Sequence, residues 1–415
     1  MSRRAKKTKN NIVLIIIDLL FILFFLFIIF SFTIGILIRG QHDISIAENR
    51  SLTKFQGFSI SKFIDRSLQD NIENTLSDQM VFGQTLKHTL NSKNAQITGI
   101  LQKKYISIFA KDYKEYIPIS NDVYYFGDSK YMLNKNLNIN ENIDKLDYIS
   151  KQYNSSFSKV PCYIYLVSNS SMIDFNSVEE TENNISNIVK QSFNNFQFDY
   201  LKIKDFSQYQ DYFYETDHHW NYKGSYQGYK DIISLLKPDD TPLVPSSTKT
   251  YDFNFYGSFA RLTSIYDNQE RFTVYKYLLP DHTVYINKEI GTYGNKDNYD
   301  NNIYIDDVTT NHYAEYYGLD YGLVEYDYNA PDKENLLVIA PSYSNAIKDL
   351  IASHFNKTYY VDLRHYKRMF GEDFVPETFI EENNIDKFLF IISIDHLVNE
   401  KFLLDNQKEG LQDGF

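Results

Sequence analysis

A carboxylate and two imidazoles stand next to the single tryptophan of the chain in the segment Asp217-His218-His219-Trp220-Asn221. Side chains at i and i+2 of an extended segment lie on one face, so Asp217 and His219 are expected to point one way and His218 and Trp220 the other. A carboxylate bonded to one imidazole nitrogen fixes the tautomer and leaves the other nitrogen free to take a proton from a nucleophile. The pattern therefore predicts an Asp-His pair that acts as a general base, whereas His218 and Trp220 are assigned to packing.

Ser342 is the candidate for the nucleophile. It lies between the apolar run Leu336–Ala340, which is typical of a central strand, and a helix predicted over Asn345–Phe355. A serine at a strand-to-helix turn has its hydroxyl at the carboxyl edge of the sheet, where the helix N-terminus can stabilise an oxyanion. The alternative is that Ser342 caps the helix, but Ser344 can fill that position as well.

Two other segments contain the residue types of a serine hydrolase. Gly127-Asp128-Ser129 follows a short predicted strand with no helix after it, which indicates a hairpin turn. Asp395-His396 follows the last predicted strand. Neighbouring side chains on an extended chain diverge, so Asp395 is not expected to orient His396, and His219 is preferred as the base.

Three other interpretations of the histidine segment stay open. Asp217, His218 and His219 could bind the metal of a metal-dependent hydrolase, although in a strand only one of the two histidines would face an ion together with the aspartate. The pair could instead be a buried hydrogen-bonded contact beside a packed tryptophan. Finally, the 36 Tyr and 31 Phe residues would suit a non-catalytic surface module that binds glycan by stacking. We expect neither a bound metal nor a cofactor.

Strands alternate with helices after residue 140, which predicts an α/β domain over 141–395 with a mostly parallel sheet covered on both faces. The alternation stops between about 245 and 330, where we expect a β-rich insertion. Residues 58–140 are predicted to form a region of helices and hairpins, and 396–415 a C-terminal tail. Within the α/β domain, strands are expected at 162–167, 200–203, 336–340, 358–363 and 388–394.

The segment 12–38 is almost entirely apolar, with Asp18 as its single charge, and about 20 apolar residues already cross a bilayer. A cleaved signal peptide is the alternative, but its apolar region is usually about 7–15 residues long. Basic residues precede the segment and Arg39 alone follows closely, which places the N-terminus in the cytoplasm. We therefore expect a cytoplasmic tail (1–11), a single transmembrane helix (12–38), a stem (39–57) and an extracytoplasmic remainder on the cell membrane.

Charge and cysteine content narrow the classes of partner. The net charge is −12 although five basic residues lie among the first ten, so the rest of the chain is more acidic still, which argues against nucleic acid. Cys162 is the single cysteine, so no intrachain disulfide can form and the fold depends on its core.

The five-residue segment, followed by Gly224, resembles the motif of the bacterial DHHW family, which is similar to the alginate O-acetyltransferase proteins of the SGNH-hydrolase superfamily. Further segments support the resemblance by their order along the chain. They are Ala47–Leu52, Ser77-Asp78-Gln79, Gly257-Ser258-Phe259, Ser342-Tyr343-Ser344-Asn345 and Val361-Asp362-Leu363-Arg364. Pro341 departs from the family, where a polar residue usually precedes the serine, but it leaves the backbone N–H of Ser342 intact.

The resemblance implies an SGNH-hydrolase-like, flavodoxin-like domain with a triad of Asp217, His219 and Ser342. It further implies an O-acetyltransferase or acetylesterase that acts on a cell-surface polysaccharide, with a multi-pass membrane acyltransferase as the acetyl donor. Trp220, Tyr343 and Arg364 are candidates for contacts with the substrate. The sequence does not separate transfer to a sugar hydroxyl from transfer to water.

Overall fold

The computed structural model describes residues 19–27, 30–31, 34–45, 50–80, 83–109, 114–135, 137–398 and 402–404. The chain forms two compact units, one of residues 1–90 with 414–415 and one of residues 91–413. The sequence placed a boundary near residue 140 instead. That boundary does not separate units because the strands before it are bonded to later residues. The N–H of Met132 donates to the carbonyl of Glu215 (2.9 Å), and the hydroxyl of Tyr131 donates to that of Gln210 (2.7 Å).

The first unit contains strands β1 (Ile44–Ser45) and β2 (Arg50–Ser51) and helices α2 (Ile60–Ile64) and α3 (Ser67–Gln79). The buried amide of Gln79 donates to the carbonyls of His42 (2.9 Å) and Thr53 (3.0 Å), which ties α3 to the preceding loop. No helix of the described part of the chain is long and apolar enough to cross a membrane. Residues 12–18, 28, 29, 32 and 33 of the predicted span lie outside the described residues.

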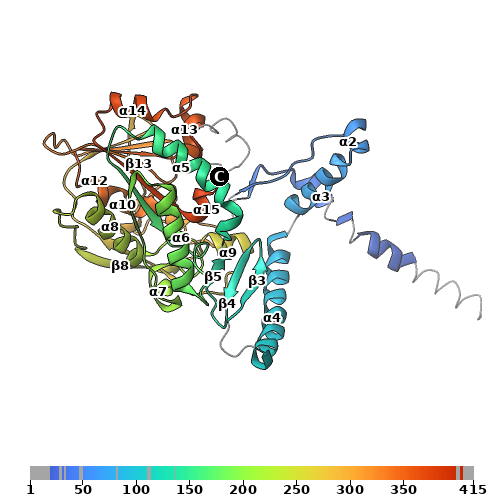
Figure 1. Ribbon diagram of the computed structural model, residues 1–415. Helices are drawn as coiled ribbons and strands as arrows, with labels where there is room; N and C mark the ends of the chain where they lie inside the picture. The colour runs from blue at the N-terminus through green and yellow to red at the C-terminus, as the bar shows by residue number, and fades with distance from the viewer. Residues whose placement is uncertain are drawn as a thin grey trace, which may run out of the picture. The chain divides into compact units, whose positions relative to one another are not determined.

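An eight-stranded sheet forms the centre of the second unit, in the order β11-β10-β12-β14-β13-β15-β6-β7 (Figure 1). The five strands from β14 to β7 run parallel, which confirms the predicted α/β fold with a mostly parallel sheet. These strands are β6 (Cys162–Val167), β7 (Phe196–Tyr200), β13 (Leu336–Ile339), β14 (Lys357–Val361) and β15 (Lys387–Ser393). The strand predicted at 200–203 begins earlier because Phe196–Tyr200 pair with Cys162–Leu166.

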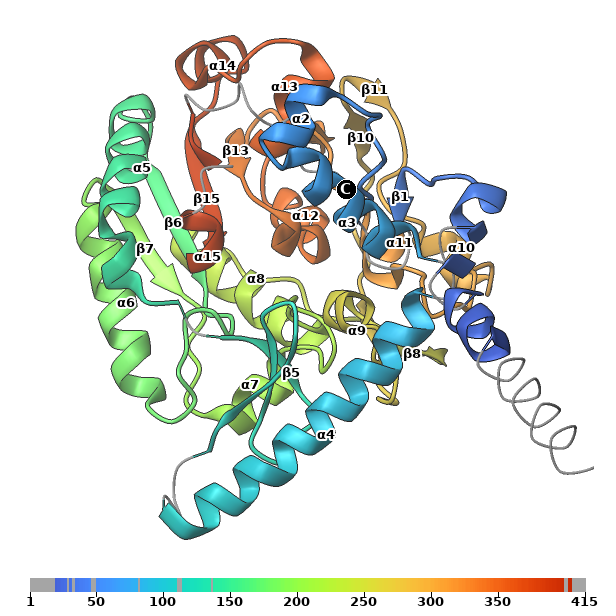
Figure 2. The ribbon, with the colours of Figure 1, turned by 90° about the vertical axis from the view of Figure 1, so that its right-hand side faces the viewer.

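Helices cover the sheet on both sides, with α5 and α6 on one side of the strands and α8 and α12 on the other (Figure 2). Every residue of β6 and β13 is buried, as expected for strands enclosed by two helical layers. The helices are α5 (Ile143–Ser156), α6 (Val178–Ser192), α7 (Phe206–Tyr212), α8 (Tyr222–Leu236), α12 (Lys348–Ala352), α13 (Leu363–Phe370), α14 (Pro376–Glu382) and α15 (Ile394–Leu397).

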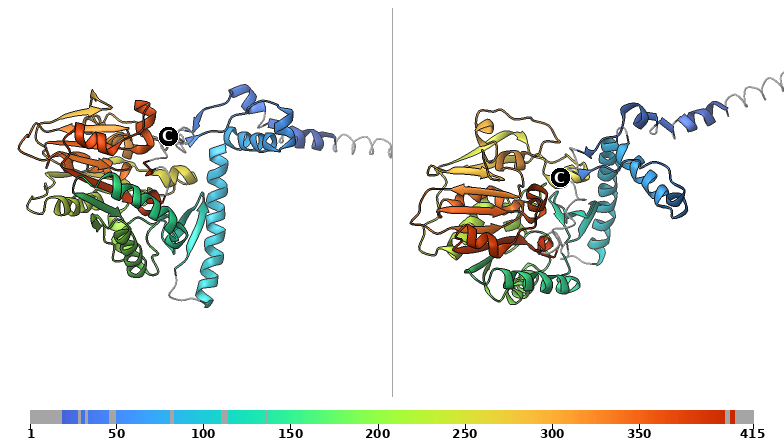
Figure 3. Two further views of the ribbon diagram at one scale, coloured as in Figure 1. Left: turned by 45° about the horizontal axis from the view of Figure 1, so that its top comes forward. Right: turned by 90° about the horizontal axis from the view of Figure 1, so that it is seen from above.

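The segment 245–330 is only in part a separate insertion. Strands β8 (Ser247–Asn254) and β9 (Arg271–Lys276) pair with each other alone, but the later strands of this segment extend the central sheet at its antiparallel edge (Figure 3). Those later strands are β10 (Thr283–Ile286), β11 (Glu289–Ile290) and β12 (Leu323–Asp327), and the segment also contains α9 (Ser258–Thr263), α10 (Lys296–Asp300) and α11 (His312–Tyr317).

Residues before the sheet form helix α4 (Gly83–Phe109) and a three-stranded antiparallel sheet of β3 (Tyr116–Ser120), β4 (Val123–Phe126) and β5 (Met132–Asn134). The Gly-Asp-Ser string lies in the turn between β4 and β5, where Gly127 has a φ of 58° and the hydroxyl of Ser129 donates to the carbonyl of Phe126 (2.8 Å). The predicted hairpin turn is thereby confirmed.

Candidate active site

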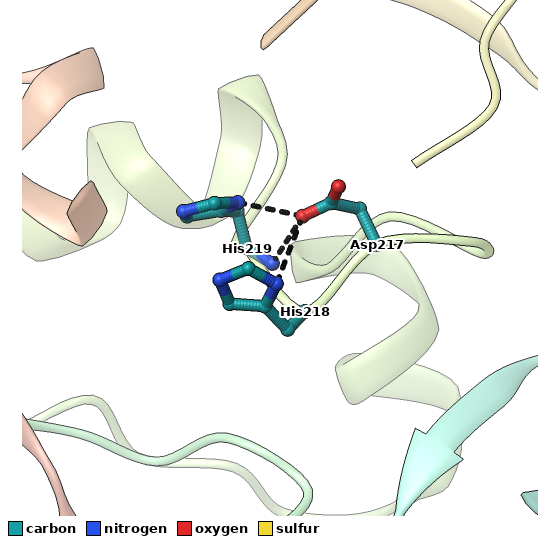
Figure 4. A group of neighbouring side chains, drawn as sticks. All are labelled: Asp217, His218 and His219. Carbon is teal, nitrogen blue, oxygen red and sulfur yellow. Dashed lines mark hydrogen bonds and ion pairs between the residues drawn. The ribbon is translucent and has the colours of Figure 1, made fainter. Parts of the chain in front are cut away.

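Asp217, His219 and Ser342 form one hydrogen-bonded chain although the histidine and the serine lie 123 positions apart in the sequence. Oδ1 of Asp217 lies 2.6 Å from Nδ1 of His219, and Nε2 of the same ring lies 2.8 Å from Oγ of Ser342. Figure 4 shows the first of these contacts. The structure therefore brings together the three residues that the sequence indicated, at hydrogen-bond distances.

The segment 215–219 is a bend between α7 and α8 and not an extended strand. Its ends are fixed by a bridge between Phe213 and Trp220 and by Asn221, whose side chain accepts the N–H groups of Lys223 (2.9 Å) and Gly224 (3.3 Å) at the start of α8. Asn221, to which the sequence gave no role, is thus the N-cap.

Because of this bend, the prediction that His218 lies on the opposite face from Asp217 and His219 is wrong. The two imidazole rings lie with their centroids 3.8 Å apart, and Nδ1 of His218 is 3.5 Å from Oδ1 of Asp217. The prediction that the side chains of Asp217 and His219 lie together is correct, but not because the segment is extended. The aspartate accepts the backbone N–H of His219 (2.9 Å) as well as its ring, which closes the bend locally.

Asp217 is buried, and both of its oxygens are used. Oδ2 accepts the backbone N–H of Ser258 (2.6 Å), the first residue of α9. Burial alone would raise the pKa of this carboxyl, but the neighbouring imidazoles of His219 and His218 outweigh burial and hold the pKa well below its ordinary value. The group is therefore a carboxylate at neutral pH, suited to stabilise an imidazolium on His219.

Residues of the 245–330 segment pack against the segment that carries Asp217 and His219. The hydroxyl of Thr216 accepts the N–H of Gly257 (3.0 Å), and the carbonyl of Thr216 accepts the N–H of Phe259 (3.0 Å). The ring of Tyr313 on α11 stacks on the ring of His219 at a centroid distance of 3.9 Å. The ring of His218 also contacts the ring of His219, at a centroid distance of 3.8 Å. His219 is thereby held in place by carboxylate, serine and two flanking rings.

Ser342 follows β13 and opens the short 3-10 helix η2 (Ser342–Ala346). Its side chain does not cap the helix, and the hydroxyl of Ser344 donates to the carbonyl of Pro341 (3.0 Å). Among the described residues the backbone N–H of Ser342 has no acceptor. Ser342 is half-buried, whereas Asp217 and His219 are buried, so Ser342 is the most accessible of the three residues.

The three residues that the sequence indicated as substrate contacts are not free to contact a substrate in the structure. Trp220 and Tyr343 are completely buried, so both rings lie in the core and not where a bound substrate would lie. The guanidinium of Arg364 bonds to Asp362 and, at 2.8 Å, to Asp320, which indicates an ion network at the edge of the sheet. For these three residues the structure favours a supporting role.

The alternative base His396 bonds to Ser393 and not to Ser342. Nδ1 of His396 is 2.7 Å from the hydroxyl of Ser393 and 3.4 Å from the carboxylate of Asp395. The prediction that the side chains of Asp395 and His396 diverge is therefore wrong. It assumed an extended chain, whereas both residues belong to helix α15. In the described part of the chain His396 makes no hydrogen bond to Ser342.

Among the residues that the structure describes, two clusters have donor atoms close enough for a metal ion, Asp217-His218-His219 and Asp320-Asp362-His365. In the first cluster Asp217 and His219 are hydrogen-bonded to each other, Asp217 also to Ser258 and His219 also to Ser342. In the second, Arg364 occupies both carboxylates. A metal would have to displace these partners, so the donor set does not favour a resident ion.

Sequence reasoning missed the roles of Gly257, Ser258 and Tyr313. An added Cβ at Gly257 would lie 2.3 Å from Cβ of Asp217, so only glycine fits there. The string Gly257-Ser258-Phe259 was noticed as part of the resemblance, but nothing in its spacing connects it with Asp217. Tyr313 carries no signal among so many tyrosines.

No protein-family model matches the sequence, and no curated protein matches it. Solved structures do match, and they include both kinds of protein that the motifs indicated. A DHHW family protein from Eubacterium siraeum shares 18% identity over 68% of this chain and 93% of its own (TM-score 0.49). The O-acetyltransferase domain of Pseudomonas putida AlgJ shares 8% identity over 66% of this chain and 91% of its own (TM-score 0.36).

Bacillus cereus PatB1 shares 22% identity over 67% of this chain and 98% of its own, with a TM-score of 0.51. PatB1 has also been solved with a sulfonyl adduct, in a structure that shares 20% identity over 67% of this chain and 96% of its own (TM-score 0.51). At such identities the likeness establishes the fold alone. The chain is therefore similar in fold to Bacillus cereus PatB1.

Proposed function

We propose that this protein is a serine-dependent O-acetyltransferase or acetylesterase that acts on a cell-surface polysaccharide, anchored to the membrane through residues 12–38. The observation that carries the proposal is the hydrogen-bonded chain from Asp217 through His219 to Ser342, with 2.6 and 2.8 Å between the bonded atoms. A base oriented by a buried carboxylate and bonded to a half-buried hydroxyl is the arrangement of nucleophilic acyl transfer.

In the first half-reaction Oγ of Ser342 attacks the carbonyl carbon of an acetyl ester while Nε2 of His219 accepts the hydroxyl proton. The leaving alcohol takes that proton when its C–O bond breaks, and acetyl-serine remains. In the second half-reaction His219 removes a proton from a sugar hydroxyl or from water, whose oxygen attacks the acetyl group. Ser342 leaves and recovers its proton from His219.

The acetyl group and the polysaccharide acceptor come from the resemblance to the DHHW family and the alginate O-acetyltransferase proteins. A multi-pass membrane acyltransferase as acetyl donor is proposed on the same ground. The sulfonyl adduct of PatB1, a protein of similar fold, indicates that PatB1 has a nucleophile that reacts with a sulfonyl reagent. For this chain Ser342 would be that nucleophile.

The test compares hydrolysis of p-nitrophenyl acetate by the purified full chain with that of Ser342→Ala. Ser129→Ala is the matched control, because Ser129 belongs to the Gly-Asp-Ser string in the hairpin turn. We expect the control to keep the wild-type rate and Ser342→Ala to lose activity. Equal rates for wild type and Ser342→Ala would remove the catalytic proposal and leave the glycan-binding alternative.

Transferase and esterase are separated by the acceptor. The full chain is incubated with the same ester in the presence of an oligosaccharide, and acetylated sugar and free acetate are measured together. A transferase makes acetylated sugar at the expense of acetate. An esterase makes acetate at a rate that the sugar does not change.

A further inference from the structure

Nε2 of His218 points to the same side as Nε2 of His219, the proposed catalytic base. In Figure 4 both imidazoles direct one nitrogen toward Asp217 and the other away from it on the same side. For His219 the nitrogen pointing away is Nε2, which meets Oγ of Ser342 at 2.8 Å. The two ring centroids are 3.8 Å apart, so Nε2 of His218 lies on the side of the two rings where Nε2 of His219 meets Ser342.

The position of His218 is fixed on both sides. Its carbonyl accepts the hydroxyl of the buried Tyr343 (2.9 Å), which in turn accepts the amide of Asn169 (2.9 Å). Its ring nitrogen Nδ1 lies 2.7 Å from the hydroxyl of Ser258. By contrast, Nε2 has no hydrogen-bond partner among the described residues, and 28% of the side chain is exposed, against 8% for His219. The ring is thus held rigidly with one polar atom left for a ligand.

The surroundings assign the tautomer of this ring. Oγ of Ser258 accepts the backbone N–H of His218 (3.4 Å), and its own proton has no acceptor in the described part of the chain other than Nδ1. Asp217 Oδ1, 3.5 Å from Nδ1, already accepts two hydrogen bonds from His219. Burial and the neighbouring His219 lower the pKa of His218 to about 3, so the ring is neutral. A neutral ring that accepts at Nδ1 carries its hydrogen on Nε2.

We propose that His218 is a catalytic residue whose Nε2–H donates to the carbonyl oxygen of the acetyl group, as the second oxyanion donor beside the N–H of Ser342. This assignment rests on the proposed acyl transfer. When Oγ of Ser342 bonds to the carbonyl carbon, the π electron pair of the carbonyl moves onto its oxygen, and the serine proton passes to His219. When the tetrahedral intermediate collapses, that pair re-forms the C=O bond, the leaving C–O bond breaks and His219 protonates the leaving oxygen.

The test uses two variants of His218 that separate its two nitrogens. His218→Asn places an amide near the position of Nδ1, where it can still bond to Ser258, but has nothing at the position of Nε2. His218→Gln places an amide N–H near the position of Nε2. We expect kcat for p-nitrophenyl acetate to fall on the order of 10²–10³-fold in His218→Asn, with KM within about threefold of wild type, as for loss of one oxyanion donor. We expect kcat of His218→Gln to be at least about tenfold higher than kcat of His218→Asn.

His282→Asn serves as the control for loss of an imidazole, because His282 is exposed and its Nδ1 contacts only the carbonyl of Pro280 (2.9 Å) among the described residues. A purely structural role would lower kcat equally in both His218 variants together with the melting temperature, which would overturn the assignment. A Ser342-dependent rate that His218→Asn leaves within about threefold of wild type would overturn the assignment of His218 alone. Equal rates for wild type and Ser342→Ala would overturn both proposals.

Discussion

Gly257 lies against Asp217 so closely that no side chain fits between them. An added Cβ at residue 257 would be 2.3 Å from Cβ of Asp217 and 2.5 Å from the carbonyl oxygen of Thr216. The φ of Gly257 is −75°, which any residue adopts, so contact and not backbone strain makes glycine necessary. The carboxylate that orients His219 is therefore positioned by a segment 40 residues further along the chain.

Gly257→Ala is expected to displace Asp217 and to lower kcat for p-nitrophenyl acetate at least about tenfold, because small displacements of catalytic groups are costly. Gly99→Ala is the matched control, since an added Cβ there meets only Cδ1 of Ile117 at an ordinary 3.7 Å. Steady-state kinetics of the two variants check this expectation. Wild-type kinetics in Gly257→Ala would mean that the site relaxes around the added methyl group at no cost.

Asp217→Asn is expected to lower kcat by about 10³–10⁴-fold. Both carboxylate oxygens accept hydrogen bonds, from the ring of His219 and from the backbone N–H of Ser258. An amide therefore places a donor against a donor whichever way it turns. Asp211→Asn, at an exposed carboxylate in the last turn of α7, is the control. The kinetic constants of the two variants are compared at pH 7, and a loss below about tenfold in Asp217→Asn would contradict the orienting role.

The positions of the three central residues could be predicted because each depends on a local rule. An apolar strand followed by Ser342 places its hydroxyl at the carboxyl edge of a parallel sheet, and Asp217 lies two residues before His219. The rule failed for His218 because it assumes an extended backbone. Residues 215–219 bend instead, since Asp217 accepts the backbone N–H of His219. A hydrogen bond of this kind does not appear in a pattern of residue types.

The remaining errors concern contacts between distant segments. Alternating runs such as Thr283–Ile286 predict strands but not their partners, so an edge strand of the central sheet could not be told from a hairpin of a separate insertion. In the same way Ser258 and Tyr313 reach the histidine only through tertiary packing. The local pattern of residue types contains no periodicity that would indicate those contacts.

Trp220→Phe is expected to reduce stability by about 2 kcal/mol, less than the loss of a whole buried aromatic ring, while KM for the acetyl ester stays within about twofold. The indole is completely buried, and it packs so tightly against α8 that an added Cβ at Gly228 would lie 2.6 Å from its ring. Urea unfolding and steady-state kinetics on the same preparation check the two parts. A raised KM with unchanged stability would instead support the substrate contact that the sequence indicated.

Glu182→Gln is expected to stabilise the protein increasingly as the pH rises from 4 to 8. Glu182 is buried on α6, accepts the backbone N–H of Ile203 (2.8 Å), and burial raises its pKa to about 7. In the unfolded chain the pKa of glutamate is about 4.3, so between these values the folded protein binds more protons and loses stability with rising pH. Glutamine keeps the acceptor oxygen, and it avoids this loss of stability, which amounts to up to about 4 kcal/mol.

The measurement is the free energy of unfolding in urea at pH 5 and at pH 8 for wild type, Glu182→Gln and Glu180→Gln, the last with an exposed glutamate on the same helix. The difference between Glu182→Gln and wild type should grow between the two pH values, whereas that of Glu180→Gln should stay constant. A constant difference for Glu182→Gln would mean that the carboxyl titrates alike in the folded and unfolded chains. In that case burial does not govern its charge, and the tie between α6 and Ile203 is made by an ordinary carboxylate.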